Sequence, residues 1–246
     1  MAGRLNRHFR VESVVFDLFH TLVDPDAYRP EGFVRPRKIA EVLGLSEVDD
    51  FVLWWRGMEA KRHVNGSKKV VQYADEYLVN HTGRHCSMDE LARVDQIWGQ
   101  MYDMSLLEPR GEVLEVLRRL RERGVKLGLL SNIDEREARN WSRSPLAPLF
   151  DVICMSFETG HSKPSGEAYS HVLSKLGVRA SSSIYVGDGN HDELGGARMA
   201  GFGLVVFMRG FISRSDVRSI ETMKRREDEA DATITDLKEL LALVEG

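Results

Sequence analysis

Short apolar runs alternate with longer amphipathic segments along most of this chain. The apolar runs predict buried strands. The amphipathic segments predict helices, two of which are followed by Gly124 and Gly177, residues suited to end a helix. Strands that alternate with helices at these spacings predict an α/β fold with a parallel, doubly wound sheet. The expected strands are residues 13–18, 125–130, 150–155, 183–186, 204–207 and 232–234, and the expected core helices are residues 111–123, 134–142, 165–176, 193–200 and 236–244.

In one long segment this alternation stops, and no strand pattern is convincing there. Ser87, followed by Glu90 three residues later, has the pattern of a capping box at the start of a helix. We therefore predict an α-helical cap, residues 25–106, inserted into a Rossmann-like core made of residues 1–24 and 107–246. The expected cap helices are residues 36–43, 46–62, 69–80 and 88–102.

The composition is that of an ordinary soluble globular protein, with 42% hydrophobic and 29% charged residues among 246. A formal net charge of −4 argues against a nucleic-acid partner, because phosphate backbones attract basic faces. No apolar stretch approaches the roughly 20 residues that cross a bilayer, and the basic N-terminus lacks the apolar segment of a signal peptide.

Cys86 and Cys154 are too few for a disulfide framework, which favours reduced thiols in a cytoplasmic protein. We expect a monomer or a homodimer that acts on a small molecule. The charge-rich residues 209–230 are expected to form a solvated helix or a mobile segment.

A carboxylate stands at the end of the first predicted strand. Val14, Val15 and Phe16 form its apolar run, and Asp17 follows directly. A carboxylate in such a place is costly unless it has a partner such as a metal or an ammonium group. Ligand crevices of parallel sheets form at this end of the strands. Asp17 is therefore a candidate reactive group, with capping of the next turn as the alternative.

Polar side chains also follow three further strands, and in a parallel sheet their loops converge on one crevice. Carboxylates there can hold Mg²⁺, a lysine can neutralise a phosphate or orient a carboxylate, and a hydroxyl can donate to a phosphoryl oxygen. Each residue taken alone could instead be a cap, a turn or a solvated side chain. These residues are Ser131 and Asn132, Lys163, and Asp188 and Asp192.

The order and spacing of these motifs resemble the haloacid dehalogenase (HAD) superfamily of hydrolases. The resemblance covers nearly the whole chain, since the helical insertion looks like the cap of that family and the C-terminal segment looks like its usual ending. It implies a Rossmann-like fold and hydrolysis through a covalent aspartyl intermediate. The motifs are DLFHTLVD at 17–24, LLSN at 129–132, HSKP at 161–164 and VGDGNHDELGGARMAG at 186–201.

The resemblance also implies roles for individual residues. Asp17 would be the nucleophile, Ser131 would hydrogen-bond the transferring group, and Lys163 would orient Asp17. Thr21 and Asn132 would help to hold the loops and the substrate.

The same resemblance implies a Mg²⁺ site. Asp17, Asp188 and the backbone carbonyl of Phe19 would be its direct ligands. Asp192 would support the metal or Lys163 from behind these ligands.

One position departs from the phosphatase pattern. A second aspartate normally stands two residues after the nucleophile, where it protonates the leaving oxygen and later activates water. Here that residue is Phe19, and His20 replaces the glycine usually found next. Losing a general acid–base typically costs about 10²–10⁴ in rate.

Three functions remain open because of Phe19. The chain can be a phosphatase whose leaving group needs little protonation, or in which His20 or water substitutes. It can be a dehalogenase-like enzyme, because a halide leaves without a proton and such branches carry an aromatic residue at this position. It can also be a binding or regulatory protein that has lost turnover.

The metal-type loop at Asp188 favours the first function over the second, since dehalogenases of this superfamily generally lack a metal. We therefore expect a Mg²⁺-dependent phosphatase for a small phosphorylated metabolite, with a cap that closes over the site. Arg29, Arg35 and Arg37 at the start of the cap could bind a substrate anion or could be ordinary surface residues.

Overall fold

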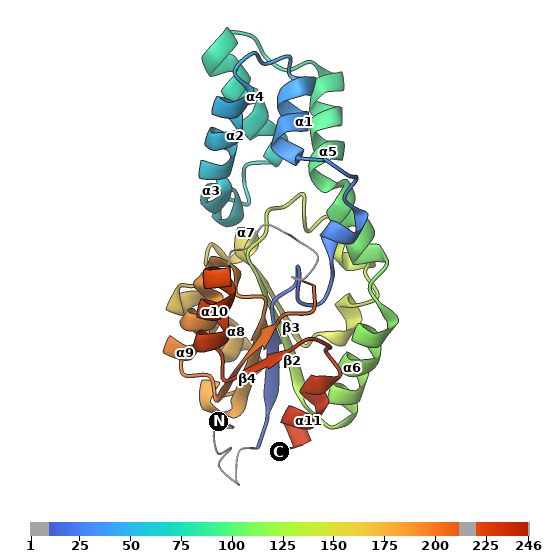
Figure 1. Ribbon diagram of the computed structural model, residues 1–246, viewed down its shortest axis with the longest axis vertical. Helices are drawn as coiled ribbons and strands as arrows, with labels where there is room; N and C mark the ends of the chain where they lie inside the picture. The colour runs from blue at the N-terminus through green and yellow to red at the C-terminus, as the bar shows by residue number, and fades with distance from the viewer. Residues whose placement is uncertain (1–9, 212–219, 246) are drawn as a thin grey trace.

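The chain is described by a computed structural model that covers residues 10–211 and 220–245. A sheet covered by helices forms one part, and a separate group of helices stands beyond one end of the sheet (Figure 1). Residues 1–9, residue 246 and residues 212–219 of the charged segment lie outside the described residues. Among the described residues, no helix combines the length and the apolar character that crossing a membrane requires.

The sheet is six-stranded, all its strand pairs are parallel, and its order is β3-β2-β1-β4-β5-β6. From the central β1 the chain builds one half of the sheet through β2 and β3 and the other half through β4, β5 and β6. This confirms the predicted doubly wound fold and puts the topological switch point beside β1. The strands are β1 Ser13–Phe16, β2 Lys126–Ser131, β3 Val152–Met155, β4 Ser183–Gly187, β5 Leu204–Met208 and β6 Ala232–Ile234.

Helices cover both faces of the sheet, and the central strand supplies side chains to both. Val14 and Phe16 belong to the apolar cluster under α6 and α11, whereas Val15 belongs to the cluster under α8 and α9. Successive side chains of a strand point to opposite faces, so a strand covered on both sides is apolar throughout. These helices are α6 Gly111–Glu122, α8 Gly166–Leu176, α9 Glu193–Met199, α10 Ile220–Glu229 and α11 Glu239–Glu245.

The segment expected to form the cap is helical in the structure and has an apolar cluster of its own, which includes Phe51, Trp55, Tyr77 and Trp98. Its last helix, α5, runs from this group toward the core (Figure 1). The division of the chain into a core and a cap stays a prediction, which a separate apolar cluster favours. The helices are α1 Arg35–Val42, α2 Val48–Gly57, α3 Glu59–Val64, α4 Val70–Thr82 and α5 Met88–Leu107.

Two expected helices differ from the structure. The helix expected over residues 46–62 is broken at Met58 into α2 and α3, next to Gly57, a residue that destabilises a helix interior. The helix expected over residues 134–142 is wrong, because the structure has turns there and only a short 3-10 helix at Trp141–Arg143.

Side-chain hydrogen bonds hold the turns of this segment in place. The Asp134 carboxylate accepts from the backbone N–H groups of Arg136 and Glu137, both at 3.0 Å, and Glu137 accepts in return from the Asp134 N–H at 3.1 Å. The Arg136 guanidinium then donates to Asp95 and Asp103 on α5. The reciprocal bonds between Asp134 and Glu137 have the pattern of a capping box, as at a helix start, and the contacts of Arg136 hold the turns that follow against α5.

The expected capping box at the start of α5 is confirmed. The Glu90 N–H donates to Ser87 Oγ at 3.2 Å, and the Ser87 N–H donates to the Glu90 carboxylate at 2.7 Å. We expect Ser87→Ala to lower the free energy of unfolding by about 1 kcal/mol, because it leaves a backbone donor of α5 without its cap. Urea denaturation measures this loss. Ser174→Ala on the exposed face of α8 is the control, expected within about 0.5 kcal/mol of wild type, and equal stabilities for both variants would contradict the capping role.

Candidate active site

A cavity of about 170 Å³ lies where β1, β2 and β4 end. The register of the sheet brings these ends together, because Phe16 pairs with Leu129 on one side and Val186 on the other. The core contributes polar side chains to its wall, and α3 of the cap segment contributes from above. The lining includes Asp17, Ser131, Asp188 and Glu193 from the core and Glu59 and His63 from α3.

A buried lysine joins two buried carboxylates in this site. The Lys163 ammonium donates to Asp17 Oδ1 at 2.5 Å and to Glu193 Oε2 at 2.6 Å. Thr21 Oγ1 donates to the other Asp17 oxygen at 3.0 Å. Asp17 is thereby held by two donors from different parts of the chain, which fixes the direction of its carboxylate.

Glu193 is a residue that the sequence analysis missed. Its carboxylate accepts from the Tyr185 hydroxyl at 2.7 Å and from the Gly189 N–H at 2.8 Å, besides Lys163. A Cβ at Gly187 would lie only 2.2 Å from Glu193 Oε1, so the glycine makes room for this carboxylate. The sequence signal was an acidic residue next to the expected Asp192, at the position where helix α9 begins.

The expectation that Asp192 supports the metal or Lys163 is wrong in this structure. Its carboxylate is 62% exposed and lies 2.9 Å from the Arg225 guanidinium. Asp192 has a positive φ of 52°, at the point where the loop turns into α9, and the next side chain enters the site instead. Glu193 therefore occupies the place in which Asp192 was expected.

Asp188 is 1% exposed, and Asn190 holds its carboxylate through its backbone N–H at 2.9 Å and its side-chain amide at 2.7 Å. The guanidinium of Arg226, on α10, donates to the Asp188 carbonyl and to the Asn190 side chain, both at 3.0 Å. The loop after β4 is thus held by α10, a helix that lies between β5 and β6 in the chain.

Ser131 and Asn132 are found at the end of β2 as expected. Ser131 is 2% exposed and lines the cavity. The Asn132 amide donates to the Lys163 carbonyl and its oxygen accepts from the Lys163 N–H, both at 2.8 Å. Asn132 therefore ties two of the predicted loops together, whereas contact of either residue with a substrate stays a prediction.

The charges of the site shift the titration of Asp17. The pKa of Asp17 is raised to about 7, because burial and the nearby carboxylates of Glu193 and Asp188 outweigh the opposing effect of the Lys163 ammonium. Burial lowers the pKa of Lys163, but Asp17 and Glu193 outweigh it and hold the pKa above its usual range. Lys163 is therefore a cation, whereas burial opposes the ionised form of Asp17.

The oxygen atoms of Asp17, Asp188 and Glu193 fit a metal ion, since one from each lies within 4.8 Å of the others. All three residues are buried. Oxygen ligands suit Mg²⁺. Each of the three carboxylates already accepts hydrogen bonds: Glu193 from Lys163, Tyr185 and Gly189, Asp17 from Lys163 and Thr21, and Asp188 from Asn190.

Comparisons with known proteins agree with this geometry. Residues 11–201 match the family of haloacid dehalogenase-like hydrolases. The chain belongs to this family.

Named relatives of this HAD-like hydrolase include phosphatases and dehalogenases. It is 28% identical to a ribulose-1,5-bisphosphate 5-phosphatase of Halopiger xanaduensis, over 94% of this chain and 98% of that protein. It is 29% identical to an (S)-2-haloacid dehalogenase of Pseudomonas sp. strain YL, over 78% of this chain and 80% of that one. Its fold matches the crystal structure of a HAD phosphatase from Thermococcus onnurineus with a TM-score of 0.62 and 20% identity, covering 96% and 99% of the two chains.

Phe19 lies in the cavity wall of this HAD-like hydrolase. Its ring packs on that of Tyr102, with 4.6 Å between centroids. His20, with a positive φ of 61°, also lines the cavity, and its Nδ1 lies 3.8 Å from an oxygen of Asp24. The structure thus brings both unusual residues to the cavity.

A second cavity, of about 370 Å³, extends the site into the cap segment. Arg29 and Arg35 line it, whereas Arg37 pairs with Asp49 on the exposed side of the helices. The Arg35 guanidinium carbon lies 4.2 Å from the centre of the Trp98 ring.

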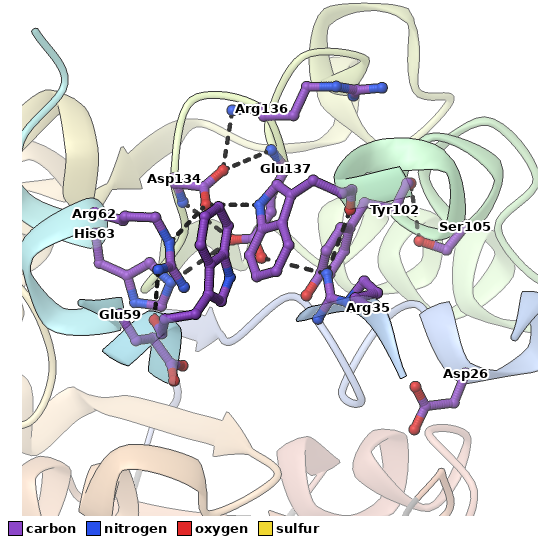
Figure 2. Close-up of polar contacts among 12 residues, drawn as sticks. Asp26, Arg35, Glu59, Arg62, His63, Tyr102, Ser105, Asp134, Arg136 and Glu137 are labelled. Atoms are coloured by element: carbon purple, nitrogen blue, oxygen red, sulfur yellow. Dashed lines mark hydrogen bonds and ion pairs between the residues drawn. The ribbon is translucent and has the colours of Figure 1, made fainter. Parts of the chain in front are cut away.

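Glu137, from the loop after β2, also lines this second cavity, and Figure 2 shows it and Asp134 facing residues of the cap segment. Glu137 lies 3.7 Å from His63 and 3.9 Å from Arg35, and Asp134 accepts from the Trp98 indole N–H at 2.9 Å. The sequence analysis missed these contacts, since nothing in the local pattern distinguishes such charged residues from a solvated surface.

The raised pKa of Asp17 predicts a change of stability with pH. The pKa is about 7 in the folded chain and about 4 in an unfolded one, so the ionised form opposes folding. This cost is absent below pH about 4 and complete above pH about 7. We expect Asp17→Asn to stabilise the metal-free protein by roughly 2 kcal/mol at pH 8 and to give no gain at pH 4.

Urea denaturation in the presence of a chelator at both pH values measures this difference. Asp192→Asn is the control, because that carboxylate is exposed. A gain for Asp17→Asn that is the same at pH 4 and pH 8 would contradict the assigned cause.

Proposed function

We propose that this HAD-like hydrolase is a Mg²⁺-dependent phosphatase for a small phosphorylated metabolite and that Asp17 is its nucleophile. The observation that carries the proposal is the convergence of Asp17, Asp188 and Glu193 with Lys163 in one buried site. The relative from Halopiger xanaduensis, a phosphatase by name, supports it. A cytoplasmic enzyme is part of the proposal, because Cys86 and Cys154 are free cysteines.

In the proposed reaction, an oxygen of Asp17 attacks the phosphorus atom of the substrate. A bond from Asp17 to phosphorus forms while the bond from phosphorus to the leaving oxygen breaks. Water then attacks the same phosphorus atom, releases phosphate and restores the carboxylate. Lys163 and Thr21 fix the attacking carboxylate, since each donates to one of its oxygens.

The remaining proposed roles belong to the ends of β2 and β4. Ser131, on the cavity wall, donates a hydrogen bond to a phosphoryl oxygen, and Asn132 keeps its loop beside Lys163. Asp17, Asp188 and the carbonyl of Phe19 would hold Mg²⁺, which when bound supplies positive charge to the phosphoryl group. Glu193 orients Lys163.

The leaving oxygen must take its proton from a group other than Phe19. His20 lines the cavity, and a histidine side chain or water can serve as a proton donor in catalysis. A substrate whose leaving group is stable without a proton depends least on such a donor.

Carbon–halogen hydrolysis is the second candidate, and Phe19 is the observation that favours it. A halide leaves without a proton, so a ring can replace the acid at this position. The relative from Pseudomonas sp. strain YL, a dehalogenase by name, supports this candidate.

An activated aryl phosphate tests the proposed function. We expect wild-type protein to hydrolyse it, a chelator to stop the reaction and Mg²⁺ to restore it. Asp17→Asn removes the nucleophile and is expected to lower the rate by a factor of about 10³ or more. Asp192→Asn, whose carboxylate faces solvent, is the matched control and is expected to keep the rate within about twofold.

Two results would count against the phosphatase. Release of chloride from a 2-chloro acid without added metal, together with no phosphate release, would support the second candidate. Binding of Mg²⁺ with no turnover of either substrate would identify a binding protein.

The missing acid at position 19 gives a further prediction. We expect Phe19→Asp to raise the rate on an alkyl phosphate by about tenfold or more and to change the aryl phosphate rate less, because only the poor leaving group needs a proton. Steady-state rates of phosphate release on both substrates measure the effect. The side chain introduced by Phe19→Asn has the size of aspartate but no acidic proton. An equal gain in that variant would therefore refute the acid–base explanation.

A further inference from the structure

A second group of possible metal ligands lies at the junction of the cap segment and the core. Glu59 and His63 come from α3, and His191 comes from the short 3-10 helix Asn190–Asp192 after β4. One ligand atom of each residue lies within 4.8 Å of the other two. No step of the proposed phosphatase reaction uses these three side chains.

Local structure on both sides directs these residues toward one another. Glu59 and His63 are four residues apart on α3, so they share one face of that helix. His191 has a positive φ of 55°, which is uncommon for a residue with a side chain. In this conformation its Nε2 lies 3.3 Å from Glu59 Oε1, and its ring centre lies 5.9 Å from that of His63.

We infer that Glu59, His63 and His191 form a binding site for Zn²⁺ or a similar transition-metal ion. Two imidazoles and one carboxylate suit zinc, whereas Mg²⁺ prefers oxygen ligands alone. Ligands about 2.1 Å from a tetrahedral ion are about 3.4 Å from one another, a spacing that modest side-chain rotation reaches from the one observed. Its two imidazole ligands distinguish this site from the site at Asp17, where all three possible ligands are carboxylates.

The surroundings of the three residues suit such a site. Glu137 Oε2 lies 3.7 Å from His63 Nε2, the arrangement in which a carboxylate orients a ligating histidine or supplies a fourth ligand. The His63 side chain is 7% exposed, whereas those of His191 and Glu59 are 41% and 47% exposed. An ion from solvent can therefore reach the site, and the buried His63 is already fixed.

Occupancy of this site joins α3 to the loop after β4. All three residues also line the cavity that contains Asp17. A bound ion therefore holds the cap segment against the core at the entrance of the cavity. Zn²⁺ is expected to stabilise the folded chain and to slow turnover by hindering movement of the cap.

Metal binding is tested directly, with excess Mg²⁺ present to occupy carboxylate sites. Calorimetric titration with Zn²⁺ is expected to show one site per chain, and Co²⁺ is expected to give the visible absorption of an ion with nitrogen ligands. Glu59→Gln, His63→Gln and His191→Asn are each expected to weaken Zn²⁺ binding at least tenfold and to abolish that absorption. Asparagine is chosen at position 191 because it tolerates a positive φ.

The chain offers a matched control for these histidine variants. His161 and His171 also have ring centres 5.9 Å apart, and no Asp or Glu is grouped with them as a third ligand among the described residues. His161→Asn is expected to leave Zn²⁺ affinity unchanged. Thermal unfolding with and without Zn²⁺ checks that each variant folds, and Zn²⁺ is expected to raise the melting temperature of wild type and not that of His191→Asn.

Two results would overturn the inference. In one, Zn²⁺ binds equally to wild type, Glu59→Gln and His191→Asn. In the other, Asp17→Asn removes the Zn²⁺ site, which would place the ion at the carboxylates. Because binding is measured without a substrate, this outcome does not depend on whether the protein is a phosphatase.

Discussion

The site is organised around the buried ammonium of Lys163. This cation bonds the carboxylates of Asp17 and Glu193, which come from the end of β1 and the start of α9. None of these three charges could be buried alone, because the cost of removing an isolated ion from water is several kcal/mol. The strand order places β1 next to β4, so the loops that follow them can meet over one lysine. Formation of the site therefore depends on the pairing of β1 with β4.

The sheet could be predicted from the sequence because strands covered on both faces are apolar along their length. The strand bounds agree within about two residues, and the expected edge strand over residues 232–234 coincides with β6. The failure over residues 134–142 has a different origin. That segment is shaped by contacts of Arg136 with Asp95 and Asp103, which are distant in sequence. A local pattern contains no information about such partners.

The residues of the site also fall into those that have a local sequence signal and those that do not. Asp17, Ser131, Lys163 and Asp188 were predictable because a polar residue after an apolar strand is a local signal. Glu193 was not, since an acidic residue in the first turn of a helix is common for electrostatic reasons alone. Glu59 and His63 of α3 were missed because charged residues four apart on a helix are typical of a solvated face.

Phe19 removes a proton donor without disturbing the groups around Asp17. Lys163, Asp188 and Glu193 come from other parts of the chain, and the ring of Phe19 packs on Tyr102 of α5. The carboxylates of Asp17, Asp188 and Glu193 lie close together with phenylalanine at position 19. An anionic substrate that approaches them meets like charge, so a divalent cation favours a phosphate ester and a haloacid alike. Dehalogenation gains nothing further from the cation, whereas phosphoryl transfer also needs positive charge on the oxygens around phosphorus. The grouped carboxylates therefore favour the phosphatase more strongly than the phenylalanine favours the dehalogenase.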